Sequence, residues 1–377
     1  MYVYSFFGDF VLLYPVYTLL FADTGLSIGQ ISSLFVLWCV AGLAFEVPSG
    51  ALADVVPRRL LLVLAPLLTA VAFALWVAAP SYWMFALGFV LWGLRSALTS
   101  GSLEALVYGE LERLGAEAHY ATLMGRGEVA GVTAAMLSGA AAAPTLAMGG
   151  YPAVGAASVA VCLCASSAAM MFPENRIRAA EQQWARAWSA NLAGGIGEVR
   201  HSAKVRSAVI LVVVVTAIWA ALDEYTPLLL SNNGFRSSDV PLLMVVVWAG
   251  AALGGLAAGR FANLGTTGVA VLIATAAVLL AVGALVCHTV GVLALAGAFG
   301  MFQLATIVTD ARLQHSITGE ARATVTSVAG MSTEVGTLAV YGSYAVAAAP
   351  HGHPGAFIAL ALPYLVVAGW LAVSRRK

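Results

Sequence analysis

Residues 35–77 read FVLWCVAGLAFEVPSGALADVVPRRLLLVLAPLLTAVAFALWV. Two apolar runs in this stretch are separated by a short connection that carries Asp54, Arg58 and Arg59. Extended to their limits, the runs cover residues 28–53 and 60–79, and each has about the length of an α-helix that crosses the hydrocarbon core of a bilayer. The stretch therefore predicts two transmembrane helices joined by a short polar loop.

Apolar runs of this length recur along the whole chain. We expect twelve spans, near residues 2–22, 28–53, 60–79, 82–108, 121–147, 151–172, 208–230, 240–260, 267–287, 290–311, 323–348 and 356–373. Of the 377 residues 61% are hydrophobic and only 10% are charged, whereas a soluble domain carries about 25% charged residues. The composition excludes a soluble globular protein and predicts an all-α integral membrane protein. Basic and acidic residues balance at 18 each, so the net charge does not indicate nucleic-acid binding.

A polar stretch divides the spans into two groups of six. We expect an N-terminal six-helix bundle at residues 1–172, a cytoplasmic linker at 173–206 and a C-terminal six-helix bundle at 207–377. In the linker, Trp184 and Trp188 lie one helical turn apart among charged residues, which predicts an amphipathic interfacial helix. For the second part of the linker, a solvated connection is an equally good interpretation.

The two groups of spans also resemble each other. The turn after the first span reads Gly25-Leu-Ser, and the turn after the seventh reads Gly234-Phe-Arg. Placing the first span on the seventh gives two repeats with the same topology. Such a parallel pseudo-repeat is typical of transporters built from two six-helix halves.

The basic residues predict the orientation in the membrane. All of them fall in the termini and connections on one side, except Arg95 inside the fourth span and Arg236 in the loop after the seventh. By the positive-inside rule that side is cytoplasmic. We therefore expect a multi-pass protein of the bacterial inner membrane with both termini in the cytoplasm and with Arg236 and His351 outside. Met1 opens directly into an apolar run, so a cleavable signal peptide is not expected.

Ionisable residues inside the spans are the strongest indication of function. Each costs roughly 2.5–3.5 kcal/mol near the middle of a membrane, so these residues must face protein partners or water. They are Asp9, Glu46, Arg95, Glu104, Glu128, Asp223, Glu224, Asp310 and Glu334. Five of them are our candidates for proton coupling or for the charge of a cavity: Asp9, Arg95, Asp223, Glu224 and Glu334.

The fourth span carries two of these charges. Arg95 has three interpretations, namely a structural ion pair with a carboxylate, proton coupling, or binding of an anionic substrate. Glu104 follows it by nine residues, which places the two on opposite faces of a continuous helix. For Glu46 and Glu104, near the predicted cytoplasmic ends of their helices, we expect a gating or structural role.

Aromatic and small residues complete the picture of the spans. Tyr14, Tyr17, Trp92, Tyr225 and Gln303 are candidates for the lining of an amphipathic substrate cavity, with ordinary packing or membrane-interface anchoring as the alternative for each. Small residues recur every four positions in the fifth and eighth spans, which predicts close helix packing there. They include Gly127, Gly131, Gly250 and Gly254.

The sequence contains no pattern that indicates an enzyme or a metal protein. It has no Walker A motif, no paired histidines on one helix and no aspartate-rich metal motif. The four cysteines lie inside apolar runs, where Cys behaves as a small hydrophobic residue. We therefore expect no cofactor and no metal, and the proton motive force as the energy source. The expected partners are a small-molecule substrate, protons and the lipid bilayer, and the expected state is a monomer.

Residues 50–59, GALADVVPRR, resemble the loop motif between the second and third helices of the major facilitator superfamily, G-x-L-a-D-r-x-G-r-k. The resemblance covers the whole chain and implies two six-helix bundles that alternate access to a central site. It also implies that Gly50 allows close helix approach and that Asp54, Arg58 and Arg59 form a cytoplasmic latch with the eleventh helix. Val55 and Pro57 depart from the motif, which implies a weaker latch.

Two further segments are similar to elements of bacterial exporters in this family. They are the run from Glu46 to Gly50 and the run from Ser100 to Tyr108, which contains Glu104. Ala143-Pro144 matches the antiporter signature of the fifth helix only in part. The resemblance implies proton-coupled efflux of a hydrophobic or amphipathic solute. Proton-coupled uptake of a small metabolite is the alternative, and a non-transport membrane protein is a remote one.

Overall fold

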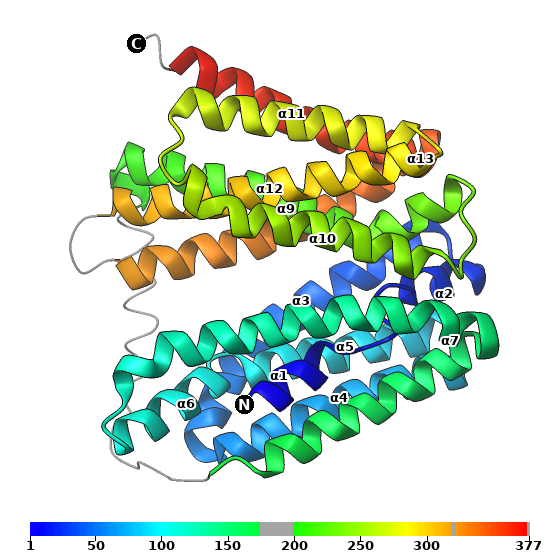
Figure 1. The fold of residues 1–377 in the computed structure, drawn as a ribbon, viewed down its shortest axis with the longest axis vertical. Coiled ribbons are helices and arrows are strands. Elements are labelled where there is room, and N and C mark those ends of the chain that lie inside the picture. The colour runs from blue at the N-terminus through cyan, green and yellow to red at the C-terminus, as the bar shows by residue number, and fades with distance from the viewer. Residues whose placement is uncertain (174–198, 318–321, 375–377) are drawn as a thin grey trace. The chain divides into compact units, whose positions relative to one another are not determined.

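The computed structural model describes residues 1–173, 199–317 and 322–374. Within these ranges all regular structure is helical. The helices are α1 (Tyr2–Asp9), α2 (Tyr17–Asp23), α3 (Ile28–Val55), α4 (Arg58–Ala78), α5 (Tyr82–Thr99), α6 (Ser102–Arg113), the 3-10 turn η1 (Glu117–His119), α7 (Tyr120–Met170), α9 (Ala203–Asn232), α10 (Val240–Phe261), α11 (Thr266–Leu285), α12 (Thr289–Ser316) and α13 (Arg322–Ser374) (Figure 1). The predicted amphipathic helix of the linker lies outside the described residues.

The twelve predicted spans are present, two of them in each of the longest helices. α7 turns back on itself at Gly150, where φ is 62°, and α13 does so at Gly352, where φ is 64°. Both angles lie in the left-handed region that favours glycine, so both residues serve as tight hairpin turns. Among the described residues, nine segments are long and apolar enough to cross a membrane, and two of these are the hairpins. The broken first span, α1 with α2, completes the set of twelve.

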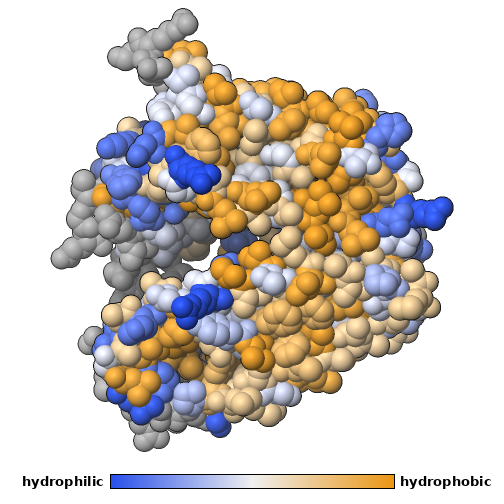
Figure 2. Space-filling view, in the orientation of Figure 1, coloured by the Kyte–Doolittle hydropathy of each residue, from blue (hydrophilic) through white to orange (hydrophobic). Residues whose placement is uncertain are grey.

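The chain forms two compact units, Met1–Ala185 and Arg186–Lys377. In the first unit α3 and α4 pack on α5, and α1 and α4 pack on α7. In the second unit α10 and α11 pack on α12, and α9 and α11 pack on α13. Each helix pair of the first unit thus has a counterpart in the second, which confirms the internal repeat. Apolar residues cover much of the visible surface of both units, as lipid-facing helices require (Figure 2).

The first span is not the continuous helix that its hydropathy predicts. α1 ends at Asp9 and α2 begins at Tyr17, and Pro15 lies between them. Proline lacks an N–H and clashes with the preceding turn, so a regular helix cannot run through this segment. The freed N–H of Leu13 donates instead to the hydroxyl of Ser158 in the second arm of α7, at 3.0 Å. A side chain from another helix therefore stabilises the break.

The fourth span is also broken, contrary to the prediction of one helix. α5 ends at Thr99 and α6 begins at Ser102, with Gly101 between them at φ 67°. This left-handed conformation is available to glycine at little cost and stops the preceding helix. The chain direction therefore changes between Arg95 and Glu104.

A tyrosine hydroxyl from α13 inserts into α9, the helix of the second unit that corresponds to the first span. Tyr364 accepts a hydrogen bond from the N–H of Trp219 at 3.0 Å and donates one to the carbonyl of Val215 at 3.0 Å. These two backbone groups belong to successive turns of α9, so the hydroxyl takes the place of a helical hydrogen bond. Insertion of a side chain into the backbone ladder is a known cause of helix kinks.

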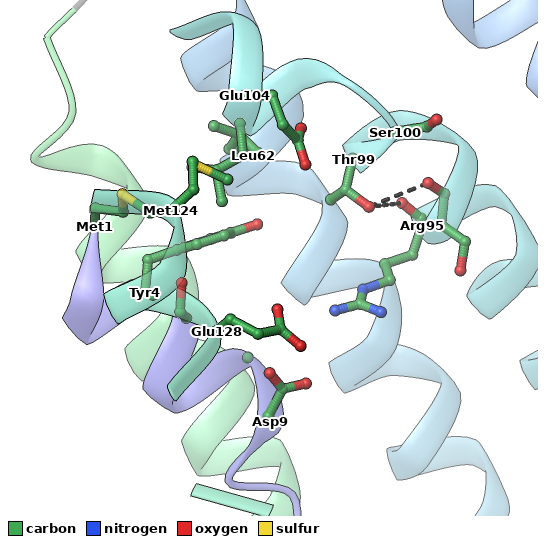
Figure 3. A pocket seen from close by; sticks show the side chains of 15 residues that line it. Met1, Tyr4, Asp9, Leu62, Arg95, Thr99, Ser100, Glu104, Met124 and Glu128 are labelled. Atoms are coloured by element: carbon green, nitrogen blue, oxygen red, sulfur yellow. Dashed lines mark hydrogen bonds between the residues drawn. The ribbon is translucent and has the colours of Figure 1, made fainter. Parts of the chain in front are cut away.

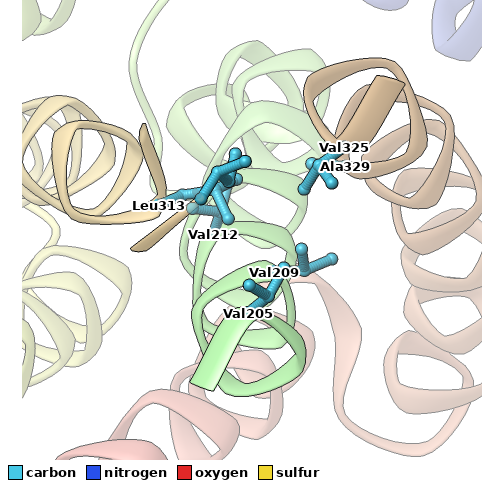
Figure 4. Packing of buried hydrophobic residues seen from close by; sticks show 7 residues of the cluster. Val205, Val209, Val212, Leu313, Val325 and Ala329 are labelled. Carbon is cyan, nitrogen blue, oxygen red and sulfur yellow. The ribbon is translucent and has the colours of Figure 1, made fainter. Parts of the chain in front are cut away.

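Packing inside each unit depends on large side chains beside small ones. In the first unit Trp76 is fully buried, and a Cβ atom at Gly88 would collide with its indole nitrogen. In the second unit a Cβ atom at Gly250 or Gly254 would meet carbonyl oxygens of α12. The close approach predicted for Gly250 and Gly254 is confirmed. Where α9, α12 and α13 meet, branched side chains such as Val205, Val209, Val212, Leu313 and Val325 fill the space (Figure 4).

Candidate functional site

A cavity of about 450 Å³ opens inside the first unit between α1, α4, α5, α6 and α7. We call it the charged cavity, because four Asp, Glu or Arg side chains line it (Figure 3). They are Asp9, Arg95, Glu104 and Glu128. The remaining lining residues are Met1, Tyr4, Ser5, Gly8, Leu62, Ser96, Thr99, Ser100, Leu103, Met124 and Gly127.

Three of the four charges lie at the two helix breaks, and α7 supplies the fourth, Glu128. Asp9 is the last residue of α1, where the chain leaves the helix, and it lies beside α7. Arg95 comes from α5 and Glu104 from α6, on either side of the break at Gly101. The prediction that these two residues occupy opposite faces is wrong, because it assumed a continuous helix. Both side chains line the same cavity.

The carboxylates and the guanidinium influence one another without touching. Figure 3 shows the carboxyl groups of Asp9 and Glu128 beside each other and facing the guanidinium of Arg95. Asp9 is attracted by Arg95 and repelled by Glu128. Among the described residues no direct ion pair joins Arg95 to a carboxylate. Polar groups that remain at a distance leave room between them for a bound solute or for water.

Two glycines of α7 make the space for α1. A Cβ atom at Gly131 would meet the carboxylate oxygen Oδ2 of Asp9, and one at Gly127 would lie 2.7 Å from the methyl carbon of Met1. Both glycines belong to the small-residue series that predicted close packing of the fifth span. The helix that packs against them is α1. The position of the Asp9 carboxylate thus depends on Gly131.

The charged cavity has an apolar side as well. Met1 and Tyr4 lie at the start of the chain, Leu62 belongs to α4, and Leu103 and Met124 complete this wall. Methionine side chains are flexible and adapt to irregular ligands. The lining therefore combines an apolar surface with three carboxylates and one guanidinium.

The predicted aromatic residues of the first unit lie elsewhere. Tyr17 and Trp92 are 2% and 6% exposed, and both belong to an aromatic cluster with Phe89 and Trp76. Tyr14 stacks on Trp92 with ring centroids 5.5 Å apart. None of these side chains lines the charged cavity.

In the second unit the predicted site residues come from three helices, α9, α12 and α13. Asp223 on α9 accepts a hydrogen bond from the indole N–H of Trp248 on α10 at 3.1 Å. Glu224 follows it and is partly buried, while Glu334 is exposed on α13. Tyr225 is fully buried and stacks on Tyr344. Gln303 is partly buried on α12, near Gly255.

The structure describes the side chains of some of the predicted gate residues. Glu46 accepts a hydrogen bond from the hydroxyl of Ser100 at 2.9 Å, which joins the second span to the break in the fourth. Arg58 begins α4, and Arg59 donates to the carbonyl of Phe172 at 3.5 Å. The side chains of Gly50 and Asp54 lie outside the described residues, so the latch itself stays a prediction.

Sequence reasoning did not select Glu128 as a site residue, although it recognised the charge within a span. The signal was its place directly after Gly127 in the small-residue series, where a neighbouring helix approaches closely. Ser5 and Thr99 also line the cavity, but serine and threonine are common in transmembrane helices and carry no such signal. In the described part of the chain no group of three or more Cys, His, Asp or Glu residues has the geometry of a metal site.

Comparisons with known proteins agree with this architecture. A family model described as Major Facilitator Superfamily matches residues 1–340. The crystal structure of nucleoside transporter NupG superposes with a TM-score of 0.79 at 12% identity, covering 100% of this chain and 98% of that one. A mutant of the same transporter gives 0.78 at 12% identity, with 99% and 97% covered. A D-xylose-proton symporter gives 0.67 at 14% identity, with 98% and 94% covered. No curated protein sequence matches the chain.

Proposed function

The chain belongs to the Major Facilitator Superfamily and is a multi-pass membrane transporter rather than an enzyme, and we propose that it exports an amphipathic, positively charged solute in exchange for protons. The observation that carries this proposal is the lining of the charged cavity. Three carboxylates face one guanidinium there, beside an apolar wall. An amphipathic cation matches both parts of that lining.

The excess of carboxylates also supplies a mechanism of exchange. Asp9 and Glu128 lie near each other, so their negative charges repel unless a positive charge enters. A proton or a cationic solute satisfies this requirement, and occupation by one lowers the affinity for the other by the same factor. Arg95 reduces the repulsion and keeps the empty cavity stable. With protons entering down their gradient, competition for the same carboxylates drives the solute outward.

The remaining predicted residues have secondary roles in this proposal. Asp223, held by Trp248, and Glu334 are further candidates for coupling in the second unit. Glu46 and Glu104 connect the cavity to the predicted cytoplasmic gate of Gly50, Asp54, Arg58 and Arg59. We propose the inner membrane as the location, cytoplasmic termini and a monomeric transporter.

Proton-coupled uptake is the second candidate. The specific observation in its favour is the similarity to a D-xylose-proton symporter over 98% of this chain. At 14% identity this similarity shows the fold alone, so it leaves the direction open. Uptake and export differ in whether proton and solute occupy the carboxylates together or in turn.

Proteoliposomes with an imposed pH gradient test the proposal. The full-length protein is reconstituted, and the flux of lipophilic cations is compared with that of neutral and anionic solutes. We expect cation flux against the direction of proton flux. Asp9→Asn and Glu128→Gln should each reduce it by about tenfold or more, the equivalent of losing ~1.4 kcal/mol of interaction. Glu112→Gln, an exposed acid of α6 that does not line the cavity, is the matched control.

Three outcomes contradict the proposal in different ways. Solute that moves inward together with protons replaces export with uptake. Flux that is indifferent to the pH gradient removes proton coupling. Normal cation flux in both cavity variants shows that the charged cavity takes no part in transport.

A further inference from the structure

A second cavity, of about 420 Å³, lies within the second unit between α9, α11, α12 and α13. We call it the basic pocket. Its ionisable lining residues are Lys204, Arg312 and His315. The other lining residues are Ser207, Ala208, Leu211, Thr266, Thr309, Ser316, Trp370 and Leu371. None of the described lining residues is acidic.

The part of the chain that the structure describes provides no carboxylate partner for the three basic side chains. Lys204 lies near the start of α9, and Arg312 and His315 lie one turn apart near the end of α12. Over residues 1–173, 199–317 and 322–374, none of the three forms an ion pair with an acidic side chain. Lys204 and His315 are exposed. The positive charges of Lys204 and Arg312 converge on one cavity and repel each other, so an anion there stabilises both.

Arg312 is held in place by the backbone. One of its terminal nitrogens donates to the carbonyl of Leu264, in the turn that precedes α11. The guanidinium therefore stays beside Thr266, the first residue of α11, a helix of 20 residues without a side-chain cap. The first turn of a helix has unpaired N–H groups and a partial positive charge, both of which favour an anion.

The opposite side of the basic pocket is apolar. Ala208 and Leu211 come from α9, and Trp370 and Leu371 from the last turns of α13. Trp370 is 52% exposed. Tryptophan is enriched where a transmembrane helix passes from hydrocarbon to lipid headgroups. The pocket thus presents basic groups beside an apolar wall at the level of a membrane interface.

We propose that the basic pocket binds the phosphate of an anionic phospholipid, with Lys204 and Arg312 on the phosphate and one acyl chain over Leu211 and Trp370. Lys and Arg are the usual partners of phosphate in proteins. A phospholipid headgroup and a soluble phosphate share the same phosphate chemistry. The apolar wall favours the phospholipid, because a soluble phosphate has no apolar part to cover it. The site lies within the second unit, so it does not depend on the proposed function of the charged cavity.

Binding to the purified full-length protein in a neutral detergent tests this assignment. Fluorescent phosphatidylglycerol is titrated at low salt, with phosphatidylcholine and inorganic phosphate as separate competitors. We expect phosphatidylglycerol to bind and neither competitor to displace it at comparable concentrations. Lys204→Gln should weaken binding about fivefold, since one basic residue near a membrane surface contributes about that factor. Lys204→Gln combined with His315→Gln should weaken it further.

The matched control is Arg260→Gln, which removes an exposed basic residue from the last turn of α10 outside the basic pocket. It should leave binding unchanged. Arg312 itself is left intact, because it also holds the turn before α11. If Arg260→Gln weakens binding as much as Lys204→Gln, the lipid responds to overall charge and the assignment is wrong. If inorganic phosphate binds and displaces the lipid, the occupant is a soluble phosphate and not a lipid.

Discussion

Replacing Gly131 with alanine tests the role of Asp9 without changing the carboxylate itself. Gly131 is buried in α7, and a Cβ atom there would meet Oδ2 of Asp9, with Cγ at 3.5 Å. Unbonded heavy atoms pack at about 3.5–4.0 Å, so the carboxylate must retreat by about 1 Å. The atom that must move is the end of a side chain. We therefore expect Gly131→Ala to fold and insert normally.

The magnitude follows from the side-chain geometry. Forcing a side chain away from its preferred rotamer costs ~0.5–1.5 kcal/mol. The arrangement in which Asp9 faces Arg95 and Glu128 then becomes about twofold to tenfold less populated. Transport that depends on this arrangement slows by the same factor. The loss should be smaller than for Asp9→Asn, which removes the charge altogether.

The assay is pH-driven flux in proteoliposomes, normalised to the amount of monodisperse protein after size-exclusion chromatography. Gly125→Ala is the matched control, because it lies on the same helix and a Cβ atom there has no neighbour within 4 Å. Both changes raise helix propensity by about 1 kcal/mol, so their difference isolates the contact with Asp9. Equal flux in the two variants, in a preparation where Asp9→Asn is slow, refutes the dependence on carboxylate position.

Three further predictions concern packing, helix geometry and topology. Gly254→Ala should destabilise the protein by about 1–3 kcal/mol, because its methyl group meets the backbone of α12. Gly259→Ala on the same helix meets nothing within 4 Å and should be neutral or stabilising. Thermal unfolding in detergent compares the two variants, and equal unfolding midpoints contradict the close packing of α10 on α12. Tyr364→Phe removes both hydrogen bonds of the inserted hydroxyl and should lower the free energy of unfolding by about 1–3 kcal/mol. An unchanged unfolding midpoint shows instead that Val215 and Trp219 form the helical hydrogen bond with each other. Cysteines at Lys204 and Arg236 should react with an impermeant thiol reagent only from the cytoplasmic and external sides respectively, and labelling of position 204 from outside overturns the topology.

Most of the architecture follows from local sequence patterns. An apolar run of about 20 residues is enough to predict a span, because the thickness of the bilayer imposes that length on every helix. The hairpin turns at Gly150 and Gly352 fall between predicted spans, and the small residues of the fifth and eighth spans mark helix contacts that the structure contains. The loop motif at residues 50–59 indicated the family whose model matches residues 1–340.

The candidate site required more than local patterns. Hydropathy does not distinguish a continuous span from a broken one, because both segments of a broken span remain apolar. The break near Pro15 is stabilised by a hydrogen bond from the N–H of Leu13 to Ser158, a residue far away in the sequence of the same unit. The break at Gly101 depends on a left-handed backbone angle.

These two breaks and the packing of α7 decide which charges meet. The sequence alone established that Asp9, Arg95, Glu104 and Glu128 lie in spans and must find polar surroundings, since a charge facing lipid is costly. It did not establish that they share one cavity, because residues on different helices come together only when the helices pack. Their common location is a property of the tertiary structure, where long-range contacts set the positions that sequence spacing leaves free.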